Sequence, residues 1–436
     1  MYRERVLRVH PSGGLPFKIR PSHYVATFIR ENATFLSIRL SIWWCVYLAF
    51  ETVCEQRGGV GYDTSAMTTP VPVLFLEPVG DIGGAQHVTL SLLKHLDRER
   101  FNPRVACLGQ GRMADEVRRL GLFCSEFRTH RFRELTCSLS AVNWVRKSIL
   151  EHGVRILHVG GTKTLAYGSP AGRLTGASIL WHLFDPPPDP PSWIDCIARA
   201  LPRDRVIASG TVTRQSWEHL LGVPVELFEL GIELHSEHSR PPAPSEFAGQ
   251  GPHVVMISRL QRFKGHTVLL DAMPAILDQF PDLQVHLIGG SLFGLETEYR
   301  EEIEARLSTP PLKGRVHLPG FVSTEKLAAL TAHCDLLVHP ALVEPFGLVV
   351  AEAMAWSRPV VAASATGPAR IVENGQTGFL VPPGDSKGLA LGIIKILSDP
   401  DRAREMGEAG RRRVEILFDS RKMARRLEEI YAEMLG

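Results

Sequence analysis

The feature that most constrains how this chain folds is an alternation of short apolar runs with stretches of helical periodicity, which occurs twice. The first series opens with the apolar run 73–76, after which apolar residues recur at helical spacing at Ala85, Val88, Leu92 and Leu96. Further apolar runs follow at 105–108, 156–159, 179–182 and 206–208. Continuous rather than alternating apolar runs are typical of strands that are buried on both faces, so the sequence predicts a parallel sheet covered by helices.

The alternation stops at residues 236–252, which contain several prolines and serines, and it starts again at residue 254. The second series has apolar runs at 254–257, 285–288, 316–318, 336–338, 360–362 and 379–381, and helical stretches around 386–397, 401–417 and 421–435 close the chain. We therefore predict an α/β protein with two doubly wound Rossmann-like domains that face each other across a cleft. Their expected ranges are 71–235 for the N-terminal domain, 236–252 for a linker, 253–418 for the C-terminal domain and 419–436 for a helix that packs back on the N-terminal domain.

Residues 1–70 do not follow this pattern. Residues 1–40 hold seven Lys or Arg and two acidic residues, a net charge of +5, and an apolar stretch of 11 residues follows at 40–50. That stretch is shorter than the roughly 20 residues that span a bilayer. A membrane-surface segment, a targeting peptide and an upstream extension outside the working protein all fit it. We expect a dispensable or poorly ordered extension, because no chemical motif precedes Val73 and Met67 would serve as a start.

The composition excludes several classes of protein. The chain of 436 residues is 44 % hydrophobic and 22 % charged, unlike a disordered chain, a coiled coil or a collagen-like fibre. Its 49 basic and 47 acidic residues leave a formal charge of +2, so no overall basic field indicates a nucleic-acid partner. The seven cysteines form no CxxC pair, and we interpret them as reduced thiols in a reducing compartment.

Three loops at expected strand ends carry the chemical signal, because ligands of open parallel sheets bind beyond the carboxyl ends of the strands. The first loop, residues 77–86, contains Gly80, Gly83 and Gly84 ahead of a helix. Glycines there let backbone amides approach an anion closely, although a plain tight turn would explain them equally well. The spacing is not GxGxxG, so the dinucleotide fingerprint is missing.

The second loop, residues 258–265, offers two cations after a buried strand. Arg259 has a planar guanidinium that suits phosphate oxygens, and Lys264 is a mobile point charge. The pair suggests a clamp for a diphosphate, and the alternative is an exposed basic turn.

The third loop begins the segment 344–352, in which Gly347 is expected to open a helix. The free amides at such a helix start lie at the positive end of the helix dipole. Glu344 and Glu352 are eight residues apart, about two helical turns, so both carboxylates are expected to serve one elongated ligand. For either glutamate alone, helix capping or packing would be the simpler explanation.

Together these loops resemble the retaining nucleotide-sugar glycosyltransferases of the GT-B fold, specifically glycosyltransferase family four. The matching features are Gly83-Gly84-Ala-Gln86, Arg259 with Lys264-Gly265, the Glu-x7-Glu pair, and the segments 367–372 and 374–381. The resemblance covers about residues 71–436 and is densest over 254–383.

The resemblance implies roles for individual residues. The donor-binding residues would be Gly83, Gly84, Arg259, Lys264, Val322, Glu344, Phe346, Gly347, Leu348 and Glu352. Arg259 and Lys264 would neutralise the diphosphate, Glu352 would bind the ribose, and Glu344 would face the sugar. The catalytic residues would be Arg259, Lys264, Glu344 and His182, where His182 matches the family's histidine at a strand end. The alternative for His182 is a histidine satisfied by its neighbours in the core or in a loop.

Two positions depart from the family. Gln86 and Arg370 stand where the family often has Glu, and Arg370 would place a cation near the expected donor pocket. These departures leave the preference for the sugar or the acceptor open. They also motivate the alternative of a non-catalytic nucleotide-sugar-binding subunit, beside that of another GT-B enzyme such as an epimerase or phosphorylase.

The function that the resemblance implies is transfer of a hexosyl group from a nucleoside diphosphate sugar to a glycan or lipid-linked acceptor with retention of configuration. The nucleotide sugar is a substrate, so no cofactor is expected, and no metal is needed if Arg259 and Lys264 neutralise the leaving diphosphate. Arg131 and Arg133 are candidates for an anionic acceptor, and a solvated basic loop is the alternative. Such an acceptor would suit a cytoplasmic enzyme of cell-envelope polysaccharide synthesis in peripheral contact with the inner membrane face.

Overall fold

The computed structural model describes residues 69–436 except 130–134, 237–238, 249–250 and 292–295, and these described residues belong to one compact unit of the chain. The predicted extension lies outside the described residues apart from Thr69 and Pro70.

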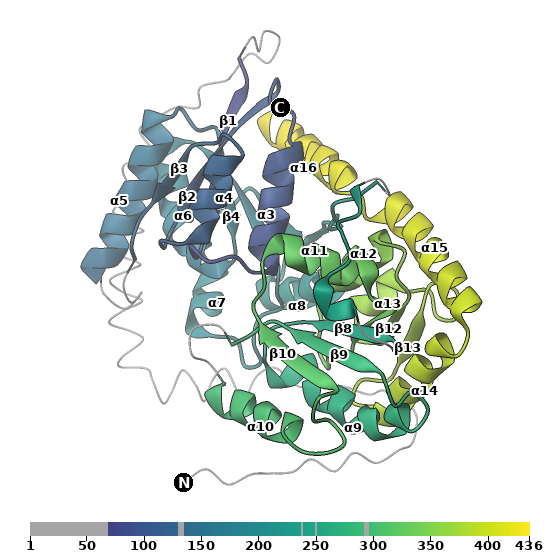
Figure 1. Ribbon diagram of the computed structural model, residues 1–436. Coiled ribbons are helices and arrows are strands. Elements are labelled where there is room, and N and C mark those ends of the chain that lie inside the picture. The colour runs from purple at the N-terminus through teal and green to yellow at the C-terminus, as the bar shows by residue number, and fades with distance from the viewer. Residues whose placement is uncertain (1–68, 130–134, 237–238, 249–250, 292–295) are drawn as a thin grey trace, which may run out of the picture. The chain divides into compact units, whose positions relative to one another are not determined.

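The first series of elements forms a parallel sheet, which in the described residues has seven strands in the order β3-β2-β1-β4-β5-β6-β7 (Figure 1). Its strands are β1 (Val71–Glu77), β2 (Phe101–Cys107), β3 (Cys124–Glu126), β4 (Ile156–Gly160), β5 (Ser178–Leu183), β6 (Arg205–Ala208) and β7 (Glu226–Leu227). Its helices are α3 (Gly84–His95), α4 (Arg112–Arg119), α5 (Leu135–Glu151), α6 (Thr162–Thr175), α7 (Trp193–Ala198) and α8 (Thr211–Leu221). The strand order reverses between β1 and β4, which is the topological switch point of a doubly wound sheet.

The second series repeats this architecture, with six strands in the described part of the chain in the order β10-β9-β8-β11-β12-β13. Its strands are β8 (His253–Ile257), β9 (Gln284–Ile288), β10 (Val316–Gly320), β11 (Leu336–His339), β12 (Val360–Ala363) and β13 (Phe379–Val381). Its helices are α9 (His266–Leu277), α10 (Thr297–Leu307), α11 (Thr324–His333), α12 (Leu348–Ala355), α13 (Pro368–Ile371), α14 (Ser386–Leu397) and α15 (Pro400–Leu417), with short 3-10 turns at Ser245–Phe247 and Arg262–Lys264. Here the order reverses between β8 and β11. The predicted pair of Rossmann-like sheets is confirmed.

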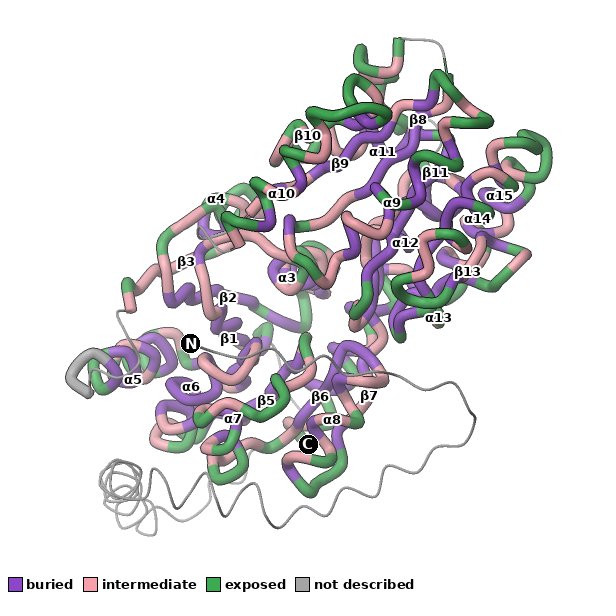
Figure 2. The backbone as a smooth tube through the Cα atoms, turned by 90° about the horizontal axis from the view of Figure 1, so that it is seen from below, coloured by how far each residue is buried: buried purple, intermediate pink, exposed green. Residues whose placement is uncertain are grey.

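Burial explains which strands were visible in the sequence. The central strands are buried along almost their whole length, as the purple tube in Figure 2 shows, so each needs a nearly continuous apolar run. Strands β3 and β7, which lie at the two edges of the first sheet, were not predicted from the sequence. They have three and two residues, are only partly buried and include polar side chains, so they produce no apolar run.

The last helix, α16 (Ser420–Leu435), packs against α3 of the N-terminal domain (Figure 1). Its inner face buries Leu427, Ile430 and Tyr431 completely. The carboxylate of Glu428 accepts a hydrogen bond from the amide of Asp97 at 2.8 Å. The chain thus returns to the N-terminal domain after completing the C-terminal one.

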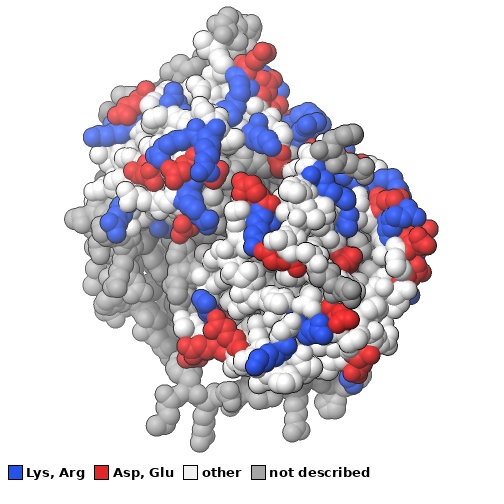
Figure 3. All heavy atoms as spheres, viewed as in Figure 1, with Lys and Arg blue, Asp and Glu red and all other residues white. Residues whose placement is uncertain are grey.

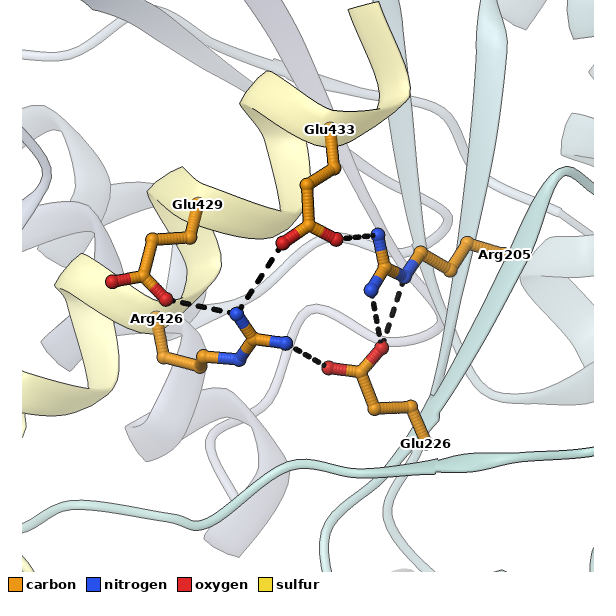
Figure 4. A network of polar contacts seen from close by, with 5 residues as sticks. All are labelled: Arg205, Glu226, Arg426, Glu429 and Glu433. Carbon is orange, nitrogen blue, oxygen red and sulfur yellow. Dashed lines mark hydrogen bonds and ion pairs between the residues drawn. The ribbon is translucent and has the colours of Figure 1, made fainter.

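A network of ion pairs also ties α16 to the edge of the first sheet (Figure 4). Arg205 of β6 contacts Glu226 of β7 at 2.6 Å and Glu433 of α16 at 2.5 Å, and Arg426 contacts Glu226 at 2.7 Å and Glu429 at 2.8 Å. These side chains are between 25 and 61 % exposed, so solvent screening leaves each pair with only a small contribution to stability. Because Arg205 and Arg426 share Glu226 as a partner, the network holds α16 in one orientation against the edge of the sheet.

The described residues on the face drawn in Figure 3 show no single broad field of charge. On the face drawn in Figure 3, basic and acidic side chains are interspersed, as the near balance of charges in the sequence predicts. None of the helices that the structure describes is long and apolar enough to cross a membrane.

Candidate active site

Two loops that follow neighbouring strands of the C-terminal domain form the centre of the candidate site. Strands β8 and β11 pair in parallel at the switch point, so residues 258–265 and 340–347 leave the sheet side by side. Gly265 holds them together: its φ is +77°, and a β-carbon there would lie 2.1 Å from the carbonyl oxygen of Pro340. The amide of Leu342 also donates to the carbonyl oxygen of Phe263 at 2.7 Å. Only glycine fits this approach at position 265, which brings the predicted clamp next to the predicted sugar-facing loop.

Lys264 and Glu344 meet between these loops. Lys264 Nζ lies 2.7 Å from Glu344 Oε2, and both side chains are nearly buried, at 13 and 12 % exposure. His339 Nε2, at the end of β11, lies 2.9 Å from the same carboxylate oxygen. Burial alone would raise the pKa of Glu344, but the hydrogen bond and charge of His339 and the charge of Lys264 outweigh it and lower the pKa to about 2. Glu344 is therefore an anion at every physiological pH.

His339 was not found by the sequence analysis, because it reads as one more residue of an apolar strand. Its side chain is 2 % exposed, and its Nδ1 is buried without a hydrogen-bond partner in the described part of the chain. The Nε2 atom of His339 contacts Glu344, so we interpret His339 as the residue that fixes the position of that carboxylate.

Arg259 is exposed and makes no hydrogen bond or ion pair with the described residues. Asp185, in the loop after β5 of the N-terminal domain, lies close enough to Arg259 and Lys264 for their charges to affect its pKa. Burial raises the pKa of Asp185, while the charges of Arg259 and Lys264 lower it and that of Glu344 raises it. The structure thus brings the predicted clamp close to a carboxylate of the N-terminal domain.

Glu352 lies in the second turn of α12, on the same side of the domain. Burial raises its pKa to about 7, and within the described part of the chain its carboxyl has no hydrogen-bond or ion-pair partner. Glu344 is not on this helix, since α12 begins at Leu348, so the two carboxylates are separated by a loop and one turn rather than two turns. A carboxyl without partners is suited to accept hydrogen bonds from ligand hydroxyls.

The start of α12 supplies backbone donors. Gly347 is the residue that precedes the helix, and no side chain caps its amides. Phe346 is buried and packs edge-on against Phe418 at 5.7 Å between ring centroids, which fixes the loop, while Leu348 is partly buried. The free amides of this turn lie at the positive end of the helix dipole.

The glycine loop of the N-terminal domain lies near this helix start. Gly83 precedes α3, and a β-carbon at Gly84 would lie 3.8 Å from the side chain of Leu348. Gln86 organises the loop: its Oε1 accepts from the amide of Gly83 at 3.1 Å and its Nε2 donates to the buried carboxylate of Glu77 at 3.0 Å. An amide at position 86 can make both bonds, whereas an ionised Glu would face the carboxylate of Glu77.

His182 is fully buried in β5. Its Nε2 lies 2.7 Å from Ser209 Oγ and its Nδ1 lies 3.2 Å from His158 Nε2, so both nitrogens are occupied. Burial, with the neighbouring His158, lowers the pKa of His182 well below its ordinary value. These contacts are those of the core histidine considered as the alternative, and direct catalysis by His182 stays a prediction.

The remaining predicted residues lie elsewhere. Arg370 of α13 is not directed at the donor loops: its guanidinium pairs with Glu229 and donates to Thr211 Oγ1 at 2.9 Å, both in the N-terminal domain. Val322 follows β10 and is partly packed against a small cluster around Ile288. Arg131 and Arg133 lie outside the described residues. In the described chain no group of three or more His, Cys, Asp or Glu is arranged to hold a metal.

Comparisons with known proteins agree with this geometry. Residues 241–413 match the family model described as Glycosyl transferases group 1. A GDP-mannose-dependent alpha-(1-6)-phosphatidylinositol monomannoside mannosyltransferase of Mycobacterium tuberculosis is 28 % identical over 297 residues, which are 61 % of this chain and 73 % of that protein. A D-inositol 3-phosphate glycosyltransferase of Corynebacterium urealyticum is 31 % identical over 199 residues, 43 % of this chain and 44 % of that protein.

Among solved structures, Anabaena HepE in complex with UDP-glucose is 25 % identical with a TM-score of 0.72, and the alignment covers 83 % of this chain and 99 % of that chain. The two parallel sheets, the paired loops at their switch points and these relatives lead to one assignment. The chain has the fold of the GT-B glycosyltransferases, and its residues 241–413 are similar to the glycosyl transferases group 1.

Proposed function

We propose that the protein transfers a hexosyl group from a nucleoside diphosphate sugar to a glycan or lipid-linked acceptor, with retention of configuration. Arg259 and Lys264 bind the diphosphate, Glu344 faces the sugar, and Glu352 accepts hydrogen bonds from the ribose hydroxyls. The amides of Phe346, Gly347 and Leu348, and the glycine loop at 83–84, contact phosphate and sugar oxygens, and Val322 lies near the base.

The observation that carries this proposal is the nearly buried contact of Lys264 with Glu344 at 2.7 Å, next to the exposed Arg259. Breaking the bond between the anomeric carbon and the diphosphate leaves negative charge on the diphosphate and positive charge on the sugar ring. Cations on the first and a fixed carboxylate near the second stabilise that separation in a cleft of low dielectric constant. Each ~1.4 kcal/mol gained only in the transition state is worth a factor of ten in rate.

Retention is proposed from the Glu-x7-Glu resemblance. No metal ion is required in this proposal, because Arg259 and Lys264 supply positive charge at the leaving group. The relatives named above support the two substrate classes, since their names include GDP-mannose as donor and inositol-containing acceptors, and the solved relative holds UDP-glucose. A lipid-linked acceptor would place the reaction at the cytoplasmic face of a membrane, with Arg131 and Arg133 as candidate contacts for its anionic group.

Neither departure from the family argues for a non-catalytic protein. Gln86 holds the glycine loop through Glu77 and Gly83, and Arg370 is engaged with Glu229 and Thr211, so both residues have a structural role in their observed contacts. A binding subunit, an epimerase and a phosphorylase are therefore outcomes of the test rather than parallel proposals.

The test is incubation of the full chain with a panel of nucleotide sugars, with and without acceptors, scored for nucleotide release and for the anomeric configuration of the product. Lys264→Met is expected to reduce turnover about 100-fold or more, a loss of ~2.7 kcal/mol. The matched control is Arg262→Met, which removes an exposed cation of the same loop that pairs with Glu302. Equal turnover by both variants would refute the clamp, and release of sugar phosphate or an epimerised nucleotide would replace the proposed reaction.

A further inference from the structure

A chain of four buried polar side chains crosses the N-terminal domain. Tyr431 Oη of α16 lies 2.7 Å from His158 Nδ1 of β4, and His158 Nε2 lies 3.2 Å from His182 Nδ1 of β5. His182 Nε2 in turn lies 2.7 Å from the hydroxyl of Ser209, which follows β6. None of the four residues is more than 4 % exposed. These contacts join residues that are up to 273 positions apart in the sequence.

The hydrogen bonds of this chain must all run in one direction. Burial lowers the pKa of His158 to about 3 and that of His182 well below its ordinary value, so both rings are neutral and each has one N–H. The chain therefore runs either from Tyr431 to Ser209 or from Ser209 to Tyr431. A phenol is a stronger acid than an aliphatic alcohol, so it is the better donor and the alcohol is the better acceptor. This difference favours the direction that starts at Tyr431.

In that direction both histidines carry their hydrogen on Nε2. Tyr431 donates to His158 Nδ1, His158 Nε2–H donates to His182 Nδ1, and His182 Nε2–H donates to Ser209. The hydroxyl hydrogen that remains belongs to Ser209, at the carboxyl edge of the sheet.

The turn that begins with Ser209 meets the donor-binding domain. A β-carbon at Gly210 would lie 2.9 Å from the carbonyl oxygen of Pro345, the residue after Glu344. Thr211, the first residue of α8, accepts the hydrogen bond from Arg370. Residues 209–211 are thus the part of the N-terminal domain that receives the loop expected to face the sugar.

We propose that Tyr431 and His158 are positioning residues for sugar transfer: they fix His182 as the Nε2–H tautomer, whose hydrogen bond to Ser209 sets the turn 209–211 against the donor loop. The inference rests on the proposed function, because only then does the position of this turn affect a reaction. In this arrangement His182 acts through Ser209 rather than by touching the donor. The C-terminal helix is consequently part of the catalytic framework rather than a covering segment alone.

The tautomers provide a test that does not depend on activity. Long-range proton–nitrogen correlation spectra of the full chain labelled with ¹⁵N-histidine distinguish Nε2–H from Nδ1–H rings. Signals of His158 and His182 are assigned by their loss in His158→Gln and His182→Gln. We expect Nε2–H for both rings, and in Tyr431→Phe we expect the His158 signal to change. An Nδ1–H ring at His182 overturns the proposal.

Enzyme kinetics test whether this chain of hydrogen bonds affects sugar transfer. Tyr431→Phe and Ser209→Ala are expected to lower kcat about tenfold while nucleoside diphosphate binding changes less than about twofold, and Ser209→Thr is expected to retain most activity. Ser169→Ala is the matched control, a buried serine of the same domain that donates to the carbonyl oxygen of Pro202. Glu433→Gln loosens α16 without touching the chain of hydrogen bonds.

The outcomes separate the two proposals. If Tyr431→Phe loses no more activity than Glu433→Gln, general docking of α16 explains the effect and the positioning role is wrong. If the unchanged protein turns over no nucleotide sugar, the proposed function fails, whereas the tautomers of the two rings are still decided by the spectra.

Discussion

The proposed ribose-binding role of Glu352 predicts that nucleotide binding releases a proton. Burial raises the pKa of its carboxyl to about 7, so at neutral pH about half of the free protein carries it protonated. Two ribose hydroxyls that donate to this group are held much more strongly when it is ionised, because a carboxylate accepts at both oxygens while a protonated carboxyl uses one oxygen as a donor. Binding of a nucleotide is therefore expected to lower the pKa of Glu352 and to expel the proton.

The size of the pH effect on nucleotide affinity follows from the pKa of Glu352, about 7. At a pH one unit below it, about a tenth of the free protein is ionised, so the affinity should fall about tenfold per pH unit, or ~1.4 kcal/mol. Near pH 7, binding should release about half a proton per nucleotide, and near pH 6 about nine tenths. Titration calorimetry in two buffers of different ionisation enthalpy measures this number directly.

Stability changes in the opposite sense. The pKa of Glu352 is raised from 4.5 to about 7 on folding, so the folded protein binds more protons than the unfolded chain between these values. The stability of the free protein therefore falls as pH rises through this window, by up to about 3 kcal/mol.

Glu352→Gln is the control for both effects. It should remove the pH dependence of nucleotide affinity below pH 7 and should stabilise the free protein above pH 8. Proton uptake on binding, or an unchanged pH slope in this variant, would refute the reasoning.

Three further predictions concern other contacts of the site. Gln86→Glu places a second carboxylate beside a buried one, so thermal unfolding should show a destabilisation of about 1–3 kcal/mol that is larger at pH 8 than at pH 5. Arg370→Glu should lower kcat/KM several-fold by repulsion from Glu229, and the exchanged pair Arg370→Glu with Glu229→Arg should restore it; no recovery would contradict the contact. His339→Leu removes a hydrogen bond that keeps the pKa of Glu344 low. Chemical denaturation should therefore show that the free energy of unfolding falls by about 1–2 kcal/mol at pH 7, and this loss should shrink below pH 4.5 towards pH 2.

The sequence predicted those features that depend on local pattern. Both sheets were visible because strands buried on two faces need continuous apolar runs, such as 336–338 in β11. The clamp was visible because Arg259 and Lys264 interrupt such a pattern directly after a strand, where a parallel sheet places its ligands. Glycine at 265 was noted only as part of a motif, and the structure gives it a cause in the close approach of Pro340.

What the sequence did not reveal depends on contacts between distant segments. His158, at the centre of the buried chain of hydrogen bonds, lies in an ordinary strand run, and its partner Tyr431 lies on the last helix. His339 likewise reads as part of a strand until its ring is seen to contact Glu344. No periodicity or spacing encodes such pairs, because they are fixed by the order of strands in the sheet and by the return of α16.

The arrangement of Lys264, Glu344 and His339 suggests why a donor site would contain a nearly buried ion pair. A diphosphate that binds Lys264 must draw it from Glu344, which would leave a nearly buried carboxylate unpaired if the lysine were its only partner. His339 is placed to prevent this, because its hydrogen bond of 2.9 Å to the same oxygen does not involve the lysine. In the free protein the carboxylate already restrains the lysine, so less of the ~2 kcal/mol of side-chain entropy of a free lysine is lost when the diphosphate binds. His339 is then the permanent partner of Glu344 and Lys264 the exchangeable one, which explains why one carboxylate oxygen is contacted by two nitrogens.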